Sequence, residues 1–217
     1  AVRVKSWRSP LADIQDFGRR IELISMDPHF HEISIGLYRQ DGKTPRFLLH
    51  SYSKIEGAPG RLSFIQQAMA ILGGMDEDDG TLTFPCGHEH NAAVRRAFLE
   101  AGKLSSGAAE PKPLSTLDKK SGLTMHVSNL GSGLYEVTAE GEAKAKDRRI
   151  KVVANGLAKL GEMKLIDGRD DQVQFPCKQD HDFLTGLLLV RAPNVRAIVR
   201  EQEMAASRGV LAAPSQQ

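Results

Sequence analysis

The sequence contains little cysteine and few aromatic residues. Its 217 residues include two cysteines, and aromatic residues make up 6% of the chain. Two cysteines are too few for the disulfide framework of a small secreted domain, so they could pair only if the fold brings them together. The low aromatic content also argues against a sheet that stacks RNA bases on exposed rings.

Long apolar runs and an excess of one charge are also absent. No apolar run approaches the ~20 residues that span a bilayer, and the opening AVRVKSWRSP has no hydrophobic region of signal-peptide type. Lys and Arg total 29 against 27 for Asp and Glu, and this balance alone does not indicate nucleic-acid binding. With 41% hydrophobic and 26% charged residues, we expect an ordinary soluble globular protein, cytoplasmic and without membrane association.

The chain does contain a repeated motif, here called the phrase, which occurs as FPCGHEHN at 84–91 and as FPCKQDHD at 175–182. The two copies share Phe-Pro-Cys, an acidic residue and a histidine at the same positions. Cys177 follows Cys86 by 91 residues, and His181 follows His90 by the same number. Further upstream, LGGM at 72–75 and LGEM at 160–163 lie 88 residues apart. Matching elements joined by loops of unequal length indicate a duplicated supersecondary unit.

The hydrophobic periodicity predicts the same elements around each phrase. We expect strand, strand, helix, strand, helix in each copy, which gives an α+β fold of two-layer sandwiches. The expected strands are 31–39, 46–55, 81–86, 123–129, 134–141 and 172–177, and the expected helices are 61–72, 91–102, 146–160 and 181–192.

The remaining segments predict the domain boundaries. Ser9 is a suitable N-cap and Pro10 suits the first helical position, so an extra helix is expected from Ser9 to about Leu23. A last helix is expected after Pro193, to about Ser207. The predicted domains are an N-terminal helical segment at 1–30, a first repeat at 31–103, a Ser-, Gly- and Pro-rich linker at 104–122, a second repeat at 123–207 and a flexible tail at 208–217.

A structural interpretation of the repeated phrase accounts for every position. Phe84 and Phe175 are strand core residues, and the following proline ends each strand by removing a backbone donor. The cysteines are then small buried hydrophobes, and Asn91 and Asp182 are N-caps of the next helices. We prefer this interpretation, and two chemical alternatives stay beside it.

The first alternative is a metal site. Cysteine thiols and histidine imidazoles are zinc ligands, and five of them occur in the two phrases: Cys86, His88, His90, Cys177 and His181. They could form one site if the two copies of the phrase face each other. The spacing is an uncommon one for zinc, however, and Gln179 stands in the second copy where His88 stands in the first.

The second alternative is a reactive thiol. A cysteine just before a helix N-terminus is favoured as thiolate, and a histidine four residues later could act as its base. A thiol enzyme also needs an orienting group and an oxyanion site, and the sequence identifies neither. Anion binding at the same helix starts is opposed by the neighbouring carboxylates.

A basic stretch, KAKDRRIK at 144–151, has Arg148 and Arg149 at its centre. It could bind nucleic acid or phosphate. Ile150 and Val153 already supply the buried stripe of this helix, so a solvated basic face is the better interpretation.

The sequence therefore predicts a binding or assembly module more than a catalyst, with no resident cofactor unless zinc binds the cysteines and histidines. Its partner would be a small ligand or a protein in a groove where the repeats join. A metal- or thiol-dependent enzyme using the two phrases is the alternative, and nucleic-acid binding through 144–151 is a minor one. Assembly into a homo-oligomer stays open.

Overall fold

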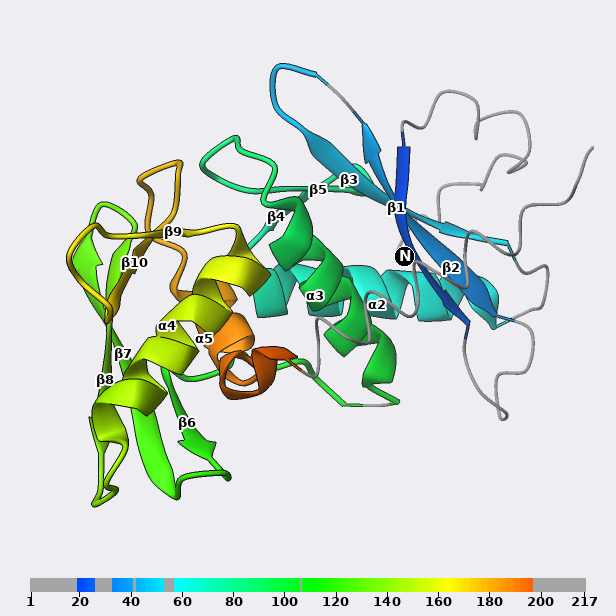
Figure 1. Ribbon diagram of the computed structural model, residues 1–217. Coiled ribbons are helices and arrows are strands. Elements are labelled where there is room, and N and C mark those ends of the chain that lie inside the picture. Colours follow the sequence, from blue (N-terminus) through cyan, green and yellow to red (C-terminus); the bar gives the residue numbers. More distant parts are fainter. Residues whose placement is uncertain (1–18, 26–32, 41, 53–56, 106, 197–217) are drawn as a thin grey trace, which may run out of the picture.

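The computed structural model describes residues 19–25, 33–40, 42–52, 57–105 and 107–196. They form two α+β units, each with helices on one face of a five-stranded antiparallel sheet (Figure 1). The α+β class predicted from the sequence is confirmed. Within the described residues, no helix combines the length and the apolar character needed to cross a membrane.

The first unit holds the β1-β2-β3-β5-β4 sheet and two helices. Its elements in chain order are β1 Arg19–Ser25, β2 Ser34–Gln40, β3 Arg46–Ser51, α2 Ala58–Gly73, β4 Asp76–Asp78, β5 Thr81–Thr83 and α3 Asn91–Lys103.

The second unit repeats this order with the sheet β6-β7-β8-β10-β9. Its elements are β6 Ser115–Asp118, β7 Leu123–Gly131, β8 Leu134–Glu140, α4 Lys146–Gly161, β9 Lys164–Leu165, β10 Gln172–Gln174 and α5 Asp182–Leu189, followed by the short 3₁₀ helix η1 Ala192–Asn194.

The two units agree in local detail as well as in element order. Helices α2 and α4 both end at a residue in the left-handed conformation, Gly74 with φ 62° and Glu162 with φ 54°. The next amide then donates back to the helix, from Met75 to Ala70 and from Met163 to Ala158. These correspondences support a tandem duplication, which stays a prediction.

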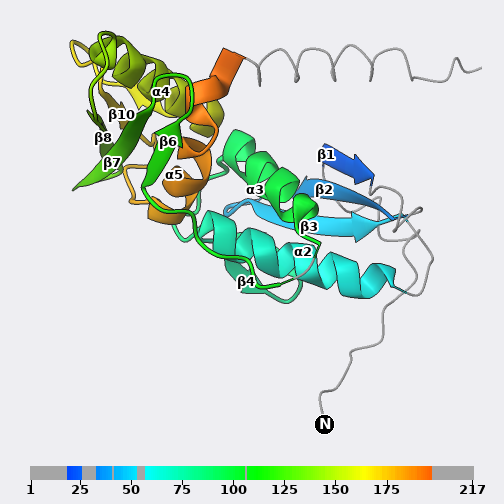
Figure 2. The same ribbon diagram turned by 90° about the horizontal axis from the view of Figure 1, so that it is seen from below.

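The helices of the two units lie between the two sheets, as Figures 1 and 2 show. Helix α5 contacts both α2 and α3, and α3 also contacts α4. The buried apolar residues of both units therefore join in one continuous core. The packing is close: a Cβ on Gly186 of α5 would lie 2.1 Å from the carbonyl oxygen of Lys112, so only glycine fits there.

Several boundaries differ from those predicted. Arg19–Leu23, expected in the N-terminal helix, belong to strand β1, because pairing with β2 extends the sheet and satisfies the backbone of both strands. The earlier part of that helix, the last helix beyond 196 and the tail at 208–217 lie outside the described residues.

Each sheet has five strands instead of the expected three. Strands β4 and β9 form in loops of low strand propensity, because each closes a short antiparallel hairpin with β5 or β10. Strand β6 lies inside the predicted linker at 104–122 and pairs with β7. Tertiary pairing has overridden local composition at these positions.

Candidate metal centre

Each repeated phrase forms a sharp corner between a strand and a helix, here called the first corner (84–91) and the second corner (175–182). The strand ends two residues before the proline, at Thr83 or Gln174, and a tight turn follows in which Gly87 donates to Phe84 and Lys178 to Phe175. Gly87 and Lys178 are both in the left-handed region, with φ 71° and 55°. The turn brings each cysteine Sγ to 3.2 Å from Nε2 of the histidine four residues later.

The two corners face each other at the junction of the units. The rings of His90 and His181 lie 4.7 Å apart between centroids, and each histidine has edge contacts to both Phe84 and Phe175. This placement follows from the packing of α5 against α2 and α3, since the corners immediately precede α3 and α5.

Four side chains meet there, and their ligand atoms all lie within 4.8 Å of one another. This set, called the corner cluster below, consists of Cys86, His90, Cys177 and His181. Both histidines are 7% exposed, while both cysteines are half-buried.

The corner cluster can hold a metal ion. Two thiolates and two imidazoles are a donor set of closed tetrahedral zinc sites, in which the ion lies ~2.3 Å from sulfur and ~2.0–2.1 Å from nitrogen. A tetrahedron with these bond lengths separates its ligand atoms by roughly 3.3–3.8 Å. The observed spacing, 3.2 Å within each Cys–His pair and at most 4.8 Å overall, is close to that geometry.

Burial shifts the pKa of Cys86, His90 and His181. Burial raises the pKa of the Cys86 thiol to about 11, with a further contribution from Cys177. Burial also lowers the pKa of His90 to about 4, assisted by the nearby charges of His181 and His88, and it lowers the pKa of His181. Both imidazoles are therefore neutral at pH 7 with a lone pair for an ion, and a bound ion would displace the Cys86 proton.

The surroundings of the two corners differ. At the second corner, the backbone N–H of His181 donates to the hydroxyl of Tyr135 at 2.6 Å, and that hydroxyl donates to Asp182 at 2.9 Å. At the first corner, Arg39 and Asn91 donate to the carboxylate of Glu89.

His88, predicted as a further metal ligand, is not one of the four grouped side chains, although its ring lies 6.3 Å from that of His90 between centroids. It is exposed, and its Nδ1 lies 3.1 Å from the carbonyl oxygen of Cys86. Its backbone N–H donates to the Cys86 sulfur at 3.4 Å, so this residue contacts a cluster member through its main chain.

The predicted N-caps also sit one position from where they were expected. Helices α3 and α5 begin at Asn91 and Asp182, and the N-cap positions are held by His90 and His181. The side chain of Asp182 instead accepts hydrogen bonds from Asn129 and Tyr135, which tie the second corner to its own sheet.

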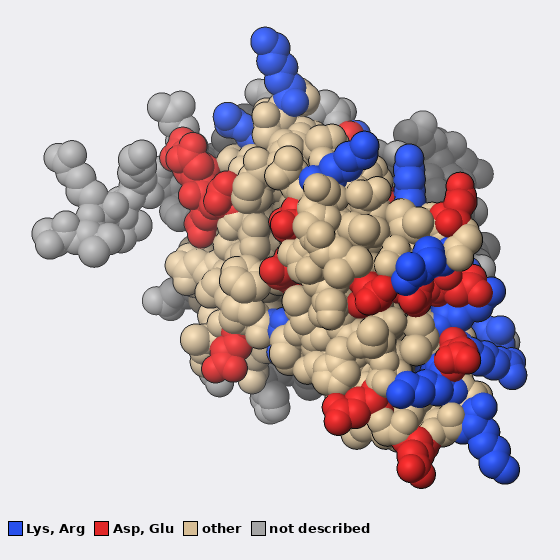
Figure 3. Space-filling view, turned by 90° about the vertical axis from the view of Figure 1, so that its left-hand side faces the viewer, with Lys and Arg blue, Asp and Glu red and all other residues tan. Residues whose placement is uncertain are grey.

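The two arginines of the basic stretch have unlike environments. Arg149 donates to Asp118 at 2.6 Å and to the carbonyl of Pro193 at 3.2 Å, whereas Arg148 is exposed. Figure 3 shows Lys and Arg interspersed with Asp and Glu over the face at the left of Figure 1. Through its hydrogen bonds to Asp118 and Pro193, Arg149 connects α4 to β6 and η1 within the second unit.

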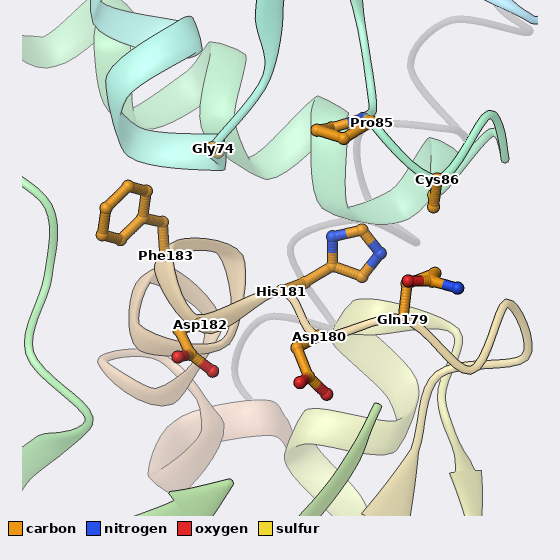
Figure 4. A pocket seen from close by; sticks show the side chains of 9 residues that line it. Gly74, Pro85, Cys86, Gln179, Asp180, His181, Asp182 and Phe183 are labelled. Carbon is orange, nitrogen blue, oxygen red and sulfur yellow. The ribbon is translucent and has the colours of Figure 1, made fainter. Parts of the chain in front are cut away.

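A cavity of about 310 Å³ adjoins the corner cluster. Figure 4 shows Gly74, Pro85 and Cys86 of the first unit on one side and His181 and Phe183 of the second on the other. The complete lining is Gly73, Gly74, Pro85, Cys86, Gln179, Asp180, His181, Asp182 and Phe183. The cavity lies where the sequence predicts a binding groove, at the junction of the repeats, and binding there stays a prediction.

Sequence reasoning missed Tyr135 and Asp118. Tyr135 lies in an apolar strand pattern, where nothing local shows that its hydroxyl reaches the second corner. Asp118 lies in a segment with the composition of a linker, and its burial follows from pairing of β6 with β7.

Comparison of the chain with protein families, characterised proteins and solved structures finds no match.

Proposed function

We propose that the protein is a zinc-binding module in which one tetrahedral centre, made by the corner cluster, fastens two α+β units to each other. The observation that carries the proposal is that four ligand atoms, two from each unit, lie within 4.8 Å of one another. Because the ligands lie in corresponding positions of the two units, an ion would bridge the junction symmetrically.

A structural role for the ion is better supported than a catalytic one. Catalytic zinc keeps one position open for water or substrate, whereas four protein ligands fill a tetrahedral shell. Both histidines are buried and flanked by Phe84 and Phe175, which limits the access of a substrate from their side.

A thiol enzyme is also poorly supported. A nucleophilic cysteine needs a pKa near or below neutrality, and burial raises the pKa of Cys86 to about 11. Its histidine neighbour is held neutral by its own burial, so a thiolate–imidazolium pair is disfavoured.

The ion would fix the walls of the adjoining cavity. Cys86 and His181 belong both to the corner cluster and to the lining, and the lining comes from both units. Its volume is at the lower end of the range for small-molecule sites, ~300–1,000 Å³. Pro85 and Phe183 give it an apolar character, so the cavity suits a small, mainly apolar ligand or one side chain of a partner protein.

Such a centre needs reduced cysteines, which are maintained in the cytoplasm. A cytoplasmic location is therefore part of this proposal.

The proposal is tested by the metal content of the full-length chain purified under reducing conditions and dialysed against zinc. We expect one zinc per chain, and we expect cobalt in its place to give the visible absorption of a tetrahedral sulfur–nitrogen site. Cys86→Ser and His181→Ala should lose the bound metal. His88→Ala is the matched control and should retain it, since His88 lies outside the corner cluster. A zinc content well below one per chain after loading would contradict the proposal.

A further inference from the structure

The two sulfurs of the corner cluster are placed where they could also form a disulfide with each other. Cys86 and Cys177 are the two cysteines of these 217 residues. They lie 91 residues apart in the chain, yet the fold places their Sγ atoms within 4.8 Å of each other. A disulfide requires a sulfur–sulfur separation of ~2.03–2.05 Å, so the two sulfurs have to move toward each other by less than about 3 Å.

The two cysteines are the more exposed residues of the corner cluster. Both cysteines are half-buried, and Cys86 lines the adjoining cavity, whereas both histidines are 7% exposed. A small oxidant that enters the cavity can reach the Cys86 sulfur, and the His181 ring lies beside it in the same lining. Oxidation of cysteine follows thiolate character and exposure, and zinc binding keeps both sulfurs as thiolates.

We propose that hydrogen peroxide converts the zinc-bound thiolate pair into a Cys86–Cys177 disulfide and releases the ion. This inference rests on the proposed function, because it assigns a redox response to the same site.

The reaction is balanced by one peroxide. One thiolate attacks a peroxide oxygen, the O–O bond breaks, and a sulfenic acid forms while the departing oxygen takes up a proton as water. The second thiolate attacks the sulfenic sulfur, the S–S bond forms, and the displaced hydroxide is protonated to a second water. Two protons are consumed, the two sulfurs together lose two electrons, and the peroxide gains them.

The ion leaves because the product has lost both anionic ligands. Two neutral imidazoles remain, and they hold zinc far more weakly than two thiolates and two imidazoles together. The disulfide joins the same two corners that the ion joined, so the units stay fastened in either state while the walls of the cavity are rearranged at Cys86.

The experiment uses the zinc-loaded full-length chain, treated with increasing hydrogen peroxide. Released zinc is followed with a chromogenic chelator, and the protein mass is measured under denaturing, non-reducing conditions. We expect one zinc released per chain together with the loss of two hydrogen atoms. A peptide joining Cys86 to Cys177 should appear, and a thiol reductant with added zinc should restore the starting state.

Two other results would overturn the inference. Zinc release accompanied by added oxygen atoms would show sulfinic or sulfonic acids, and a disulfide between two chains would show that the corners do not meet. Retention of zinc and of both thiols at peroxide concentrations that oxidise a free cysteine would also overturn it.

The same samples separate this inference from the proposed function. Zinc content before peroxide tests the proposed function, and the mass after peroxide tests the disulfide. Cys177→Ser should form no internal cross-link. Because that variant could fold poorly, zinc-stripped wild type treated with oxidised glutathione provides a second measurement, and there the Cys86–Cys177 cross-link is again expected.

Discussion

Tyr135 is the residue that holds the second corner against its sheet. Its hydroxyl accepts the backbone N–H of His181 and donates to the carboxylate of Asp182. Phe47 occupies the corresponding place in the first unit, since Phe47 pairs with Leu82 and Tyr135 with Val173. Both rings make edge contacts with the phenylalanine of their own corner. The hydroxyl is therefore what distinguishes the two positions.

Tyr135→Phe should lower the free energy of unfolding by about 1–3 kcal/mol, because the buried His181 amide loses its acceptor while the ring still fills its place. Urea unfolding monitored by circular dichroism gives this value. Tyr52→Phe is the control: Tyr52 is 42% exposed, and a change within about 0.5 kcal/mol is expected. Equal midpoints for Tyr135→Phe and wild type would show that the hydroxyl does not support the corner.

At the scale of elements, one ion pair connects an edge strand to a helix. Asp118 of β6 is 1% exposed and accepts hydrogen bonds from Arg149 of α4, from the Ser121 hydroxyl and from the Lys120 amide. Arg149 also donates to the carbonyl of Pro193 in η1. These contacts fasten β6, the first turn of α4 and η1 to one another.

Arg149→Met should cost about 3 kcal/mol of unfolding free energy, the lower end of the range for breaking a buried pair, because Asp118 keeps its other two donors. Arg148→Met removes the same charge from the same helix at an exposed position, and a change within about 0.5 kcal/mol is expected. The pair of variants is compared by urea unfolding at pH 7. Similar losses of unfolding free energy in both variants would show that the effect comes from the charge removed and not from the contact with Asp118.

The same ion pair predicts a pH dependence. Burial acts to raise the pKa of Asp118, but hydrogen bonds from Ser121, Arg149 and Lys120 outweigh it and hold the pKa below its ordinary value of 3.8. Because the folded pKa lies below the unfolded one, this stabilisation is complete above the unfolded pKa and is lost as the pH falls through the folded pKa.

Between pH 6 and pH 2, wild type should therefore lose more stability than Asp118→Asn, with the difference arising below about pH 4. Other groups contribute equally to both proteins, so the comparison isolates Asp118. Parallel stability curves would contradict the prediction.

At the scale of the whole molecule, the two units share one core and meet at the corner cluster. An ion bound there interacts with the folded chain, in which both corners are in place, and much less with the unfolded chain. Binding that is selective for the folded state raises stability by mass action.

Zinc should therefore raise the unfolding temperature of the reduced protein, and a chelator should reverse the effect. At free zinc 1,000 times the dissociation constant, the stabilisation is about 4.1 kcal/mol, less any binding to the unfolded chain. Thermal unfolding with and without zinc measures it. His90→Ala should show no zinc-dependent shift, and His88→Ala should shift as wild type does; a shift that survives His90→Ala would place the ion elsewhere.

The sequence by itself determined which helices and central strands the two units contain. Hydrophobic periodicity identified helices α2 to α5 of the described residues and the central strands, and the equal offset of Cys86 to Cys177 and of His90 to His181 identified corresponding corners. These features are local: a helix stripe, a strand alternation or a proline that ends a strand depends on residues close together in the chain.

Tertiary structure decided the edge strands and the meeting of the two corners, because both depend on residues far apart in the chain. Strands β1, β4, β6 and β9 exist because a neighbouring strand pairs with them, and no periodic pattern marks them. Each phrase supplies one cysteine and one histidine, which are half of the corner cluster. The packing of α5 on α2 and α3 decided that the two halves meet in one cluster, because it gathers corners that lie 91 residues apart in the chain. Apolar packing of this kind leaves no trace in the local sequence.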